Sequence, residues 1–343
     1  MSQEVAEEKY KVFNDCVHGY IKLHPLCIKI IDTPEFQRLR NLKQVGPVYF
    51  VYPGASHNRF EHSLGVCYLA GQMIEALRRS NPDIVSDYEK LAVEVAGLCH
   101  DLGHGPISHT WERFLSRTGQ HWKHEKTSIE VFEFLIEKNK LQNEIEKYLA
   151  PVGKRVEDFI VLIKRLIRGE VQDEKTFLFQ IISNKSNGID VDRWDYFMRD
   201  SKQLHLNFSF DYRRLLEFCQ VLEVNGKSVI CFRKKEAQNV YNMFITRADL
   251  HLKAYRHHVV EVLEEMIIDA FYFANEAGYK IKGKLLSEVH KDVEVFTEMT
   301  DHILYNILYS EEPIFDKAKT LLRRILCRDL YIIVGRKNFS SEL

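Results

Sequence analysis

The sequence predicts a mainly α fold with a small β-hairpin element. From residue 61 onward, apolar residues recur at spacings of three and four over most of the chain, which is the pattern of amphipathic helices. An Asn-Gly pair at 225–226 lies between two β-branched runs, as is typical of a hairpin with a type I′ turn. We expect residues 1–10 to form a flexible N-terminus and 11–343 to form a single core with a helical C-terminal extension, because no repeat or linker divides them.

The first sixty residues are the least helical part of this prediction. β-Branched residues and turn signals over 12–31 indicate an extended, turning segment. Thr33-Pro34-Glu35 is typical of a helix start, Gly46-Pro47 ends that helix, and 48–53 is again expected to be extended.

The later elements follow from periodicity. Helices are predicted over 61–79, 91–98 with His100 at the C-terminal end, 123–138, 156–168, 176–183 and 236–277, followed by Gly278 and two or three further helices. The hairpin is predicted over 221–230. Asp192, Tyr196 and Asp200 are spaced by four and are expected to share one helix face.

Charge and cysteine content exclude several classes of protein. The 48 lysines and arginines nearly balance the 49 aspartates and glutamates, which disfavours extended binding to nucleic acid or an anionic membrane. Seven cysteines without a C-x-x-C spacing fit a reducing compartment, and Cys67, Cys99 and Cys219 are expected in the core. Without a signal peptide or a membrane-length apolar run, the protein is expected to be intracellular, in the nucleus or cytoplasm.

Histidines cluster in one part of the chain. Seven of the fifteen lie between His57 and His124, and His100-Asp101 is followed by two glycines that allow a close approach of backbone and ligand. Imidazole and carboxylate are ligands for divalent transition metals. A buried core histidine is the alternative for His100, so the pair alone leaves both interpretations open. His62 could supply a third ligand, and Asp192 is our candidate for a fourth.

The remaining histidines suit proton transfer. Imidazole is a common proton carrier near neutral pH, which makes His104, His109 and His124 candidates. Glu112 or Glu125 could orient one of them, although a surface histidine is the alternative for His124. In the long helix, a cationic stripe with an aromatic residue can clamp a polyphosphate, although such a stripe is more often a solvated face. It consists of Arg247, His251, Lys253, Tyr255, Arg256, His257 and His258.

Three runs carry a resemblance to a known family: HNRFEHSLG at 57–65, HDLGHGP at 100–106 and NGIDVDRWDY at 187–196. They resemble the HD-domain phosphohydrolase superfamily, and more closely its deoxynucleoside triphosphate triphosphohydrolases with SAM and HD domains, over nearly the whole chain. The resemblance implies an HD-type helical bundle that converts a dNTP to deoxynucleoside and inorganic triphosphate.

The resemblance also implies roles for individual residues. The metal, zinc or iron with manganese as an alternative, would be held by His62, His100, Asp101 and Asp192. His124 would be the catalytic acid, with His104 and His109 near the α-phosphate and Glu112 supporting His109. The substrate would contact Arg59, Arg193, Tyr196 and Arg247 through its triphosphate, Gln44 and Asp200 through its 3′-hydroxyl, Val45 and Tyr255 through its deoxyribose, and Arg256 through its base.

Activation by nucleotides is a further implication of the resemblance. GTP and dNTP, with Mg²⁺, would bind between subunits of a homo-oligomer that grows from dimer to tetramer, and weak binding of single-stranded nucleic acid is a further expected property. The matching positions are Lys11, Val12, Asp32, Gln37 and Arg40 for GTP, Asn14, Val51, Arg214, Arg233, Lys235, Asn239, Lys253, His257 and His258 for the dNTP, and Lys319 and Arg323 for either activator.

Several positions depart from the family. Arg193 stands in place of a lysine, Arg256 in place of a glutamine and Glu112 in place of an aspartate, which bears on base preference and not on the metal. No region of the sequence matches the SAM domain or the C-terminal lobe of the family, so the tetramer is the implication that depends most on residues outside it.

Two alternatives stay open. One is a hydrolase of another nucleotide, such as a cyclic dinucleotide or guanosine tetraphosphate, against which Gln44, Asp200 and Tyr255 argue. The other is a catalytically silent binder of nucleotides or single-stranded nucleic acid, which the near-zero net charge and the complete ligand set disfavour.

Overall fold

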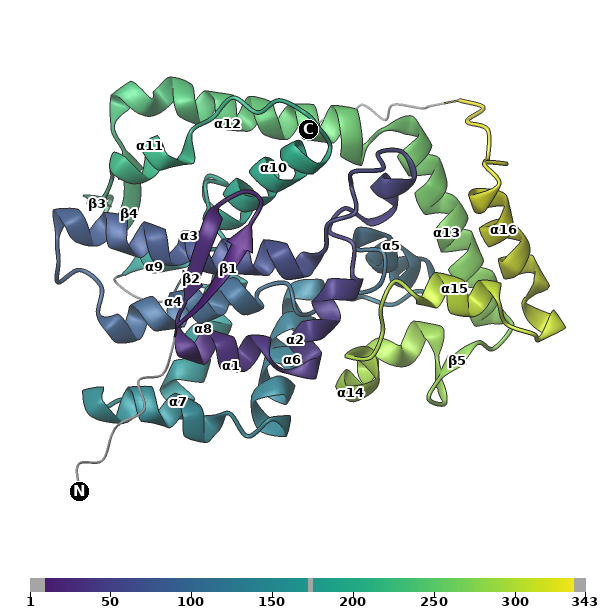
Figure 1. Ribbon diagram of the computed structural model, residues 1–343, viewed down its shortest axis with the longest axis horizontal. Coiled ribbons are helices and arrows are strands. Elements are labelled where there is room, and N and C mark those ends of the chain that lie inside the picture. The colour runs from purple at the N-terminus through teal and green to yellow at the C-terminus, as the bar shows by residue number, and fades with distance from the viewer. Residues whose placement is uncertain (1–9, 172–174, 336–343) are drawn as a thin grey trace.

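The computed structural model describes residues 10–171 and 175–335, and its architecture is almost wholly helical (Figure 1). This confirms the mainly α prediction. The predicted flexible N-terminus, apart from Tyr10, lies outside the described residues. In the part of the chain that the structure describes, no helix has the length and apolar character to cross a membrane.

Helices make up most of the described chain, and short strand pairs lie between them. The helices are α1 (Pro25–Ile31), α2 (Pro34–Gln37), α3 (Arg59–Ser80), α4 (Asp87–Cys99), α5 (His109–Arg117), α6 (His124–Lys138), α7 (Gln142–Leu149), α8 (Val156–Arg168), α9 (Thr176–Phe179), α10 (Val191–Gln203), α11 (Tyr212–Glu217), α12 (Ala237–Leu250), α13 (His258–Glu276), α14 (Val293–Phe296), α15 (Ile303–Leu308) and α16 (Asp316–Leu326). Antiparallel pairs are formed by β1 (Lys11–Asp15) with β2 (Gly19–Leu23), β3 (Cys219–Val224) with β4 (Lys227–Phe232), and β5 (Lys280–Ile281) with β6 (Lys284–Leu285).

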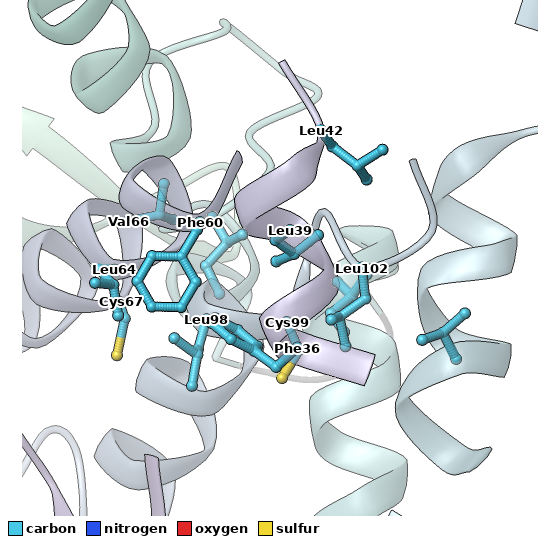
Figure 2. Packing of buried hydrophobic residues seen from close by; sticks show 14 of the residues in the cluster. Phe36, Leu39, Leu42, Phe60, Leu64, Val66, Cys67, Leu98, Cys99 and Leu102 are labelled. Atoms are coloured by element: carbon cyan, nitrogen blue, oxygen red, sulfur yellow. The ribbon is translucent and has the colours of Figure 1, made fainter. Parts of the chain in front are cut away.

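A buried apolar cluster fixes the start of α3 against the end of α4. Figure 2 shows Phe36 of α2, Phe60 of α3 and Leu98 of α4 in this cluster, and all three side chains are at most 3% exposed. The rings of Phe36 and Phe60 meet edge to face with centroids 5.6 Å apart. Each such side chain contributes roughly 1.5–3 kcal/mol on burial. Packing therefore positions the two helix ends that carry His62 and His100.

Most of the helices expected from periodicity are present. Those predicted over 61–79, 91–98, 123–138 and 156–168 correspond to α3, α4, α6 and α8, and the described residues after Gly278 contain the helices α14, α15 and α16. The predicted hairpin is β3–β4, in which Val224 pairs with Lys227 and both Asn225 and Gly226 have positive φ. Cys67, Cys99 and Cys219 are buried, and all seven cysteines are free.

In the first sixty residues, the extended segment predicted over 12–31 is confirmed only in its first half, and the extended segment predicted over 48–53 was wrong. The second half of 12–31 is helix α1 because Pro25 occupies its first turn and His24 caps it, accepting a hydrogen bond from the Leu26 N–H at 3.1 Å. The first half is the β1–β2 hairpin. Residues 48–53 are not extended, since Pro47 begins a 3-10 turn over Gly46–Phe50.

The long helix predicted over 236–277 is interrupted, and the helix predicted over 176–183 ends early, at Phe179. Between α12 and α13 lies a π-helical turn, His251–Tyr255, in which the Arg256 N–H bonds the His251 carbonyl at 2.9 Å. A π turn inserts one extra residue and rotates the side chains that follow, and such turns are frequent at functional sites. Here the turn brings His251 and Tyr255 into the lining of a cavity.

Candidate active site

A cavity of about 320 Å³ lies where α3, α10 and the π turn meet the segment after α4. Most of the residues that line it carry polar or charged side chains, and most were predicted from the sequence. The lining is Gln44, Val45, Gly46, Val48, Arg59, His62, Asp101, His104, Ile107, Ser108, His109, His124, Asp192, Arg193, Tyr196, Asp200, His251, Tyr255, Val260 and Glu264.

Three helices deliver ligand atoms to the floor of this cavity. Donor atoms of His62 on α3, His100 at the end of α4 and Asp192 on α10 all lie within 4.8 Å of one another. Asp192 Oδ1 is 3.0 Å from His62 Nε2 and 3.4 Å from His100 Nε2. The carboxylate of Asp101 lies 3.6 Å and 3.4 Å from the same two nitrogens. The predicted ligand set thus converges although Asp192 is far from the others in sequence.

Both imidazoles are oriented by their second nitrogen. The Nδ1 of His62 is 2.8 Å from Asp195 Oδ2, and the Nδ1 of His100 is 2.8 Å from the Gly97 carbonyl. With Nδ1–H donating, each Nε2 presents a lone pair to the floor. The Nε2 of His100 is buried and has no hydrogen-bond partner. Two such nitrogens and two carboxylates fit a divalent transition metal.

Asp195 holds the His62 ring of the floor in place, and it was not predicted from the sequence. It accepts hydrogen bonds from Arg199 at 2.9 and 3.0 Å and lies 2.6 Å from His18, and Arg199 also bonds Asp15 at 2.9 Å. These side chains are almost fully buried. A Cβ at Gly65 of α3 would collide with the Asp195 carboxylate. The partners come from distant segments, so no local spacing signals this bracing.

The charges of the floor favour a cation. Burial lowers the pKa of His62, but hydrogen bonds to Asp192 and Asp195 outweigh it and raise that pKa to about 10. Burial opposes ionisation of Asp101, yet His100 and Arg59 hold its pKa well below the usual range. The pKa of Asp192 is likewise lowered by His100 and His62. A site that keeps a proton on an imidazole this strongly is one where a divalent metal can replace that proton.

The outer wall of the cavity carries the other predicted histidines. The rings of His104 and His124 stack with centroids 4.0 Å apart, and His109 lies across from both. Burial, Arg59 and His124 hold the pKa of His104 well below its ordinary value, so this imidazole is neutral. Glu112 Oε2 is 3.8 Å from the Nδ1 atoms of His109 and His124, and the two nearby imidazoles lower the pKa of Glu112 to about 2.

Arg59 joins the floor to a strained loop. Its guanidinium donates to Asp101, to the Ser108 hydroxyl and, at 3.3 Å, to the Gln44 carbonyl, while its Nε is buried without a partner. Ile107 has φ of 56°, which is costly for a β-branched residue. The Ile107 N–H is held by Asp301 at 2.7 Å. The loop is therefore fixed in the shape that completes the cavity.

The opposite side of the cavity offers polar groups of another kind. Asp200 lies 2.6 Å from His57 Nε2 and accepts the Tyr255 hydroxyl at 2.5 Å. The Oε1 of Gln44 is buried and has no hydrogen-bond partner. A ligand hydroxyl could satisfy that acceptor.

The other predicted substrate residues are divided between the cavity and its surroundings. Arg193, paired with Asp190, and Tyr196 line it. Arg256 lines an adjoining cleft of about 830 Å³, and Arg247 lines neither. Gly46, Val48, Ile107, Ser108, Val260 and Glu264 line the cavity without having been assigned a role from sequence, whereas His251 was predicted only as part of the cationic stripe.

The residues predicted to bind activators do not line the cavity. Several are engaged with each other or with neighbours: Lys11 with Asp32 at 3.7 Å, Arg40 with Gln37 at 2.7 Å, and Arg214 with Glu236 at 2.6 Å. Lys319 is buried, and its ammonium donates to the Ser310 and Glu312 carbonyls at 3.2 and 3.0 Å. Most of the others are exposed on the surface.

Comparison with known proteins relates this site to a family. The HD domain model matches residues 59–200, the span that contains all four floor ligands. The chain is 48% identical to deoxynucleoside triphosphate triphosphohydrolase SAMHD1 of Gallus gallus, over 95% of this chain and 56% of that protein. It is 44% identical to the protein of the same name from Homo sapiens, over 99% of this chain and 57% of that protein.

A viral relative is covered more completely. The chain is 33% identical to the putative HD domain-containing protein L394 of Acanthamoeba polyphaga mimivirus, over 95% of this chain and 73% of that protein. By contrast, the chain spans a little over half the length of the two vertebrate relatives.

Proposed function

The chain belongs to the HD-domain family, and from this premise we propose that it is a metal-dependent hydrolase converting deoxynucleoside triphosphates to deoxynucleosides and inorganic triphosphate. The observation that carries the proposal is that His62, Asp101 and Asp192, with His100 beside them, line one cavity together with Arg59, Arg193 and the unpaired Gln44 acceptor. The similarity to the SAMHD1 triphosphohydrolases over nearly the whole chain supports the same substrate class.

The floor residues would hold one transition metal ion, zinc, iron or manganese. When bound, such an ion supplies Lewis-acid polarisation of a phosphoryl oxygen and lowers the pKa of water. Arg59 and Arg193 would neutralise the triphosphate, which suits their forked guanidinium groups. Tyr196 and Arg247 would complete this contact, with Mg²⁺ accompanying the nucleotide.

The sugar would lie against Asp200 and Gln44. Both present acceptors, but Asp200 is already engaged, so a 3′-hydroxyl can donate its one proton to the unpaired Oε1 of Gln44. Tyr255 is anchored to Asp200 by its hydroxyl. Its ring, with Val45, would leave no space for a 2′-hydroxyl, and Arg256 would face the base.

Proton transfer is assigned to the outer wall. A water oxygen adds to the α-phosphorus and releases one proton to solvent, the bond from phosphorus to the 5′-oxygen breaks, and His124 gives its proton to the departing oxygen. His104 is too strongly held in its neutral form to be this acid, so it would act as a hydrogen-bonding group beside the phosphate with His109. Glu112 would orient the two outer histidines.

We also propose activation by GTP and dNTP between subunits of an oligomer. The exposed positions Lys11, Asp32, Arg233, Lys235 and His258 lie outside the cavity and are accessible to a second nucleotide. The buried Lys319 would have to exchange its carbonyl partners to take part.

One experiment tests both proposals. The purified protein is analysed for bound metal and then given each dNTP, with and without GTP, while released triphosphate and oligomer mass are measured. Triphosphate and deoxynucleoside that appear only with GTP are the expected result. Hydrolysis of a cyclic dinucleotide or guanosine tetraphosphate in place of dNTP, or tight dNTP or RNA binding without turnover in metal-loaded protein, would overturn the proposed reaction.

A further inference from the structure

The outer wall contains a second group of metal-type ligands, separate from the floor. Donor atoms of His109, Glu112 and His124 lie within 4.8 Å of one another, and none of the three residues belongs to the His62–His100–Asp192 group. Glu112 is central, with its Oε2 at 3.8 Å from the Nδ1 of each histidine.

The geometry of this group is close to that of a bound ion. Donors of a tetrahedral zinc site are separated by about 3.3 Å, given metal–ligand distances near 2.0–2.1 Å. The observed 3.8 Å separations between Glu112 Oε2 and the two Nδ1 atoms are slightly wider. Because the His109 and Glu112 side chains are partly exposed, they can rotate to shorten these distances. The His109 side chain is 67% exposed and that of Glu112 is 35% exposed.

One atom of the group is left without a partner. The Nδ1 of His124 is buried and makes no hydrogen bond, although the side chain as a whole is 20% exposed. This nitrogen lies 3.8 Å from Glu112 and also from Glu125 without bonding to either, and an ion placed between it and Glu112 can satisfy it.

The donor set indicates which ion would bind. Two imidazoles and one carboxylate favour zinc or cobalt over magnesium, which prefers oxygen ligands and retains its water. Three protein ligands on a partly exposed wall leave a position open to solvent. Binding is therefore expected to be reversible, unlike binding at the enclosed floor.

We propose that His109, Glu112 and His124 form a second, exchangeable transition-metal site whose occupation inhibits the enzyme. The inhibitory consequence rests on the proposed function, whereas the site does not. An ion on Nδ1 of His124 withdraws Glu112 from orienting that ring. It also leaves a neutral imidazole, whose remaining Nε2 proton is too weakly acidic to be given to the 5′-oxygen.

A neighbouring arrangement is less suitable. Asp101, His104 and His124 also lie within 4.8 Å of one another. Asp101, however, is already assigned to the floor ion and is also paired with Arg59, so its carboxylate is not free for a second ion. The two arrangements share only His124, so variants of Glu112 and His109 distinguish them.

The test uses the complete protein with its first ion in place. Co²⁺ is titrated into it, and bound metal and the visible absorption of cobalt are followed in wild type, Glu112→Gln, His109→Gln and the control His121→Gln. His121 is an exposed histidine in the segment between α5 and α6 and belongs to none of the metal groups. Wild type and the control are expected to take up a second ion, and the other two variants are not.

Uptake of only one ion by wild type, or of a second ion by Glu112→Gln and His109→Gln, would overturn the site. Circular dichroism checks that each variant is folded. In the same samples, excess Zn²⁺ is expected to inhibit triphosphate release by wild type and to leave the residual activity of Glu112→Gln unaffected. A second ion without any triphosphohydrolase activity would contradict the proposed function and not the site.

Discussion

The floor and the outer wall of the cavity are built from the same residue types, yet they differ in how firmly neighbouring groups hold their side chains in place. On the floor, His62 and His100 are bonded through Nδ1, and Asp195 is held in turn by Arg199 and His18. On the wall, the His109 and Glu112 side chains are partly exposed, and the His109 Nδ1 and Glu112 Oε2 atoms are 3.8 Å apart. Preorganised ligands bind an ion with little reorganisation, and mobile ones suit groups that must exchange protons.

The difference teaches that residue type alone does not assign a role. The histidines and carboxylates of the two regions would be interchangeable by composition, but only the floor has a buried framework that fixes tautomer and direction. The floor is therefore expected to govern metal retention, and the wall to govern turnover. Variants of each region test that division, from the largest expected effect to the smallest.

Removing a floor ligand is expected to have the largest effect. Asp192→Ala leaves His62 and His100 without the carboxylate they share, so bound metal and triphosphate release should both fall to background. Metal analysis and a product assay measure this. Asp83→Ala, at an exposed carboxylate outside the metal groups, should change neither, and an Asp192→Ala protein with full metal and turnover would disprove the assignment.

Removing the wall acid should reduce turnover and spare the metal. His124→Gln is expected to lower kcat by roughly 10²–10⁴-fold, the usual contribution of a positioned acid. The metal content of the floor should be unchanged, because His124 is not among its ligands. Loss of metal together with activity would show that wall and floor are not separable.

Removing Arg199, which pairs with Asp195 behind the floor, should mainly lower the free energy of unfolding. Arg199→Leu leaves Asp195 and Asp15 as buried carboxylates without their cation, which typically costs about 3–5 kcal/mol in the free energy of unfolding. Urea denaturation measures it. Arg79→Leu, which breaks an ion pair with Glu217 whose side chains are more than half exposed, is the control and should change stability little.

Glu94 is a buried carboxylate that lacks, among the described residues, a close arginine partner of the kind that Asp195 has, so it should make the free energy of unfolding depend on pH. Burial raises the pKa of Glu94 to about 7, and Lys90 at 3.9 Å, itself paired with Glu75 at 2.5 Å, does not prevent this. A carboxyl pKa raised on folding means that stability is lost as pH rises from the unfolded value of 4.5 through 7.

Glu94→Gln removes that loss, so its stability relative to wild type should rise between pH 4.5 and pH 7 and remain higher above it. The gain should be on the order of 2 kcal/mol at pH 8, measured by urea unfolding at several pH values. An unchanged difference between the two proteins over this range would mean that Glu94 ionises normally.

The sequence predicted the fold wherever structure depends on near neighbours. Apolar spacing located α3, α4, α6 and α8, and Asn225-Gly226 located the hairpin turn. The prediction failed where a residue type, such as proline, can either end a helix or begin one. Pro25 and Pro47 were interpreted as breaks but begin helical turns, and the π turn at His251–Tyr255 has no apolar signature.

By itself, the sequence determined the chemistry available: the helix ends that carry His62 and His100, the shared face of Asp192, Tyr196 and Asp200, and the family resemblance. Only the tertiary structure decided which of these groups meet. Periodicity reports contacts between residues three or four positions apart. Three features depend instead on how whole helices pack against one another: the chain of contacts from His62 through Asp195 and Arg199 to Asp15, the unpaired nitrogen of His124, and the position of Tyr255 in the cavity lining.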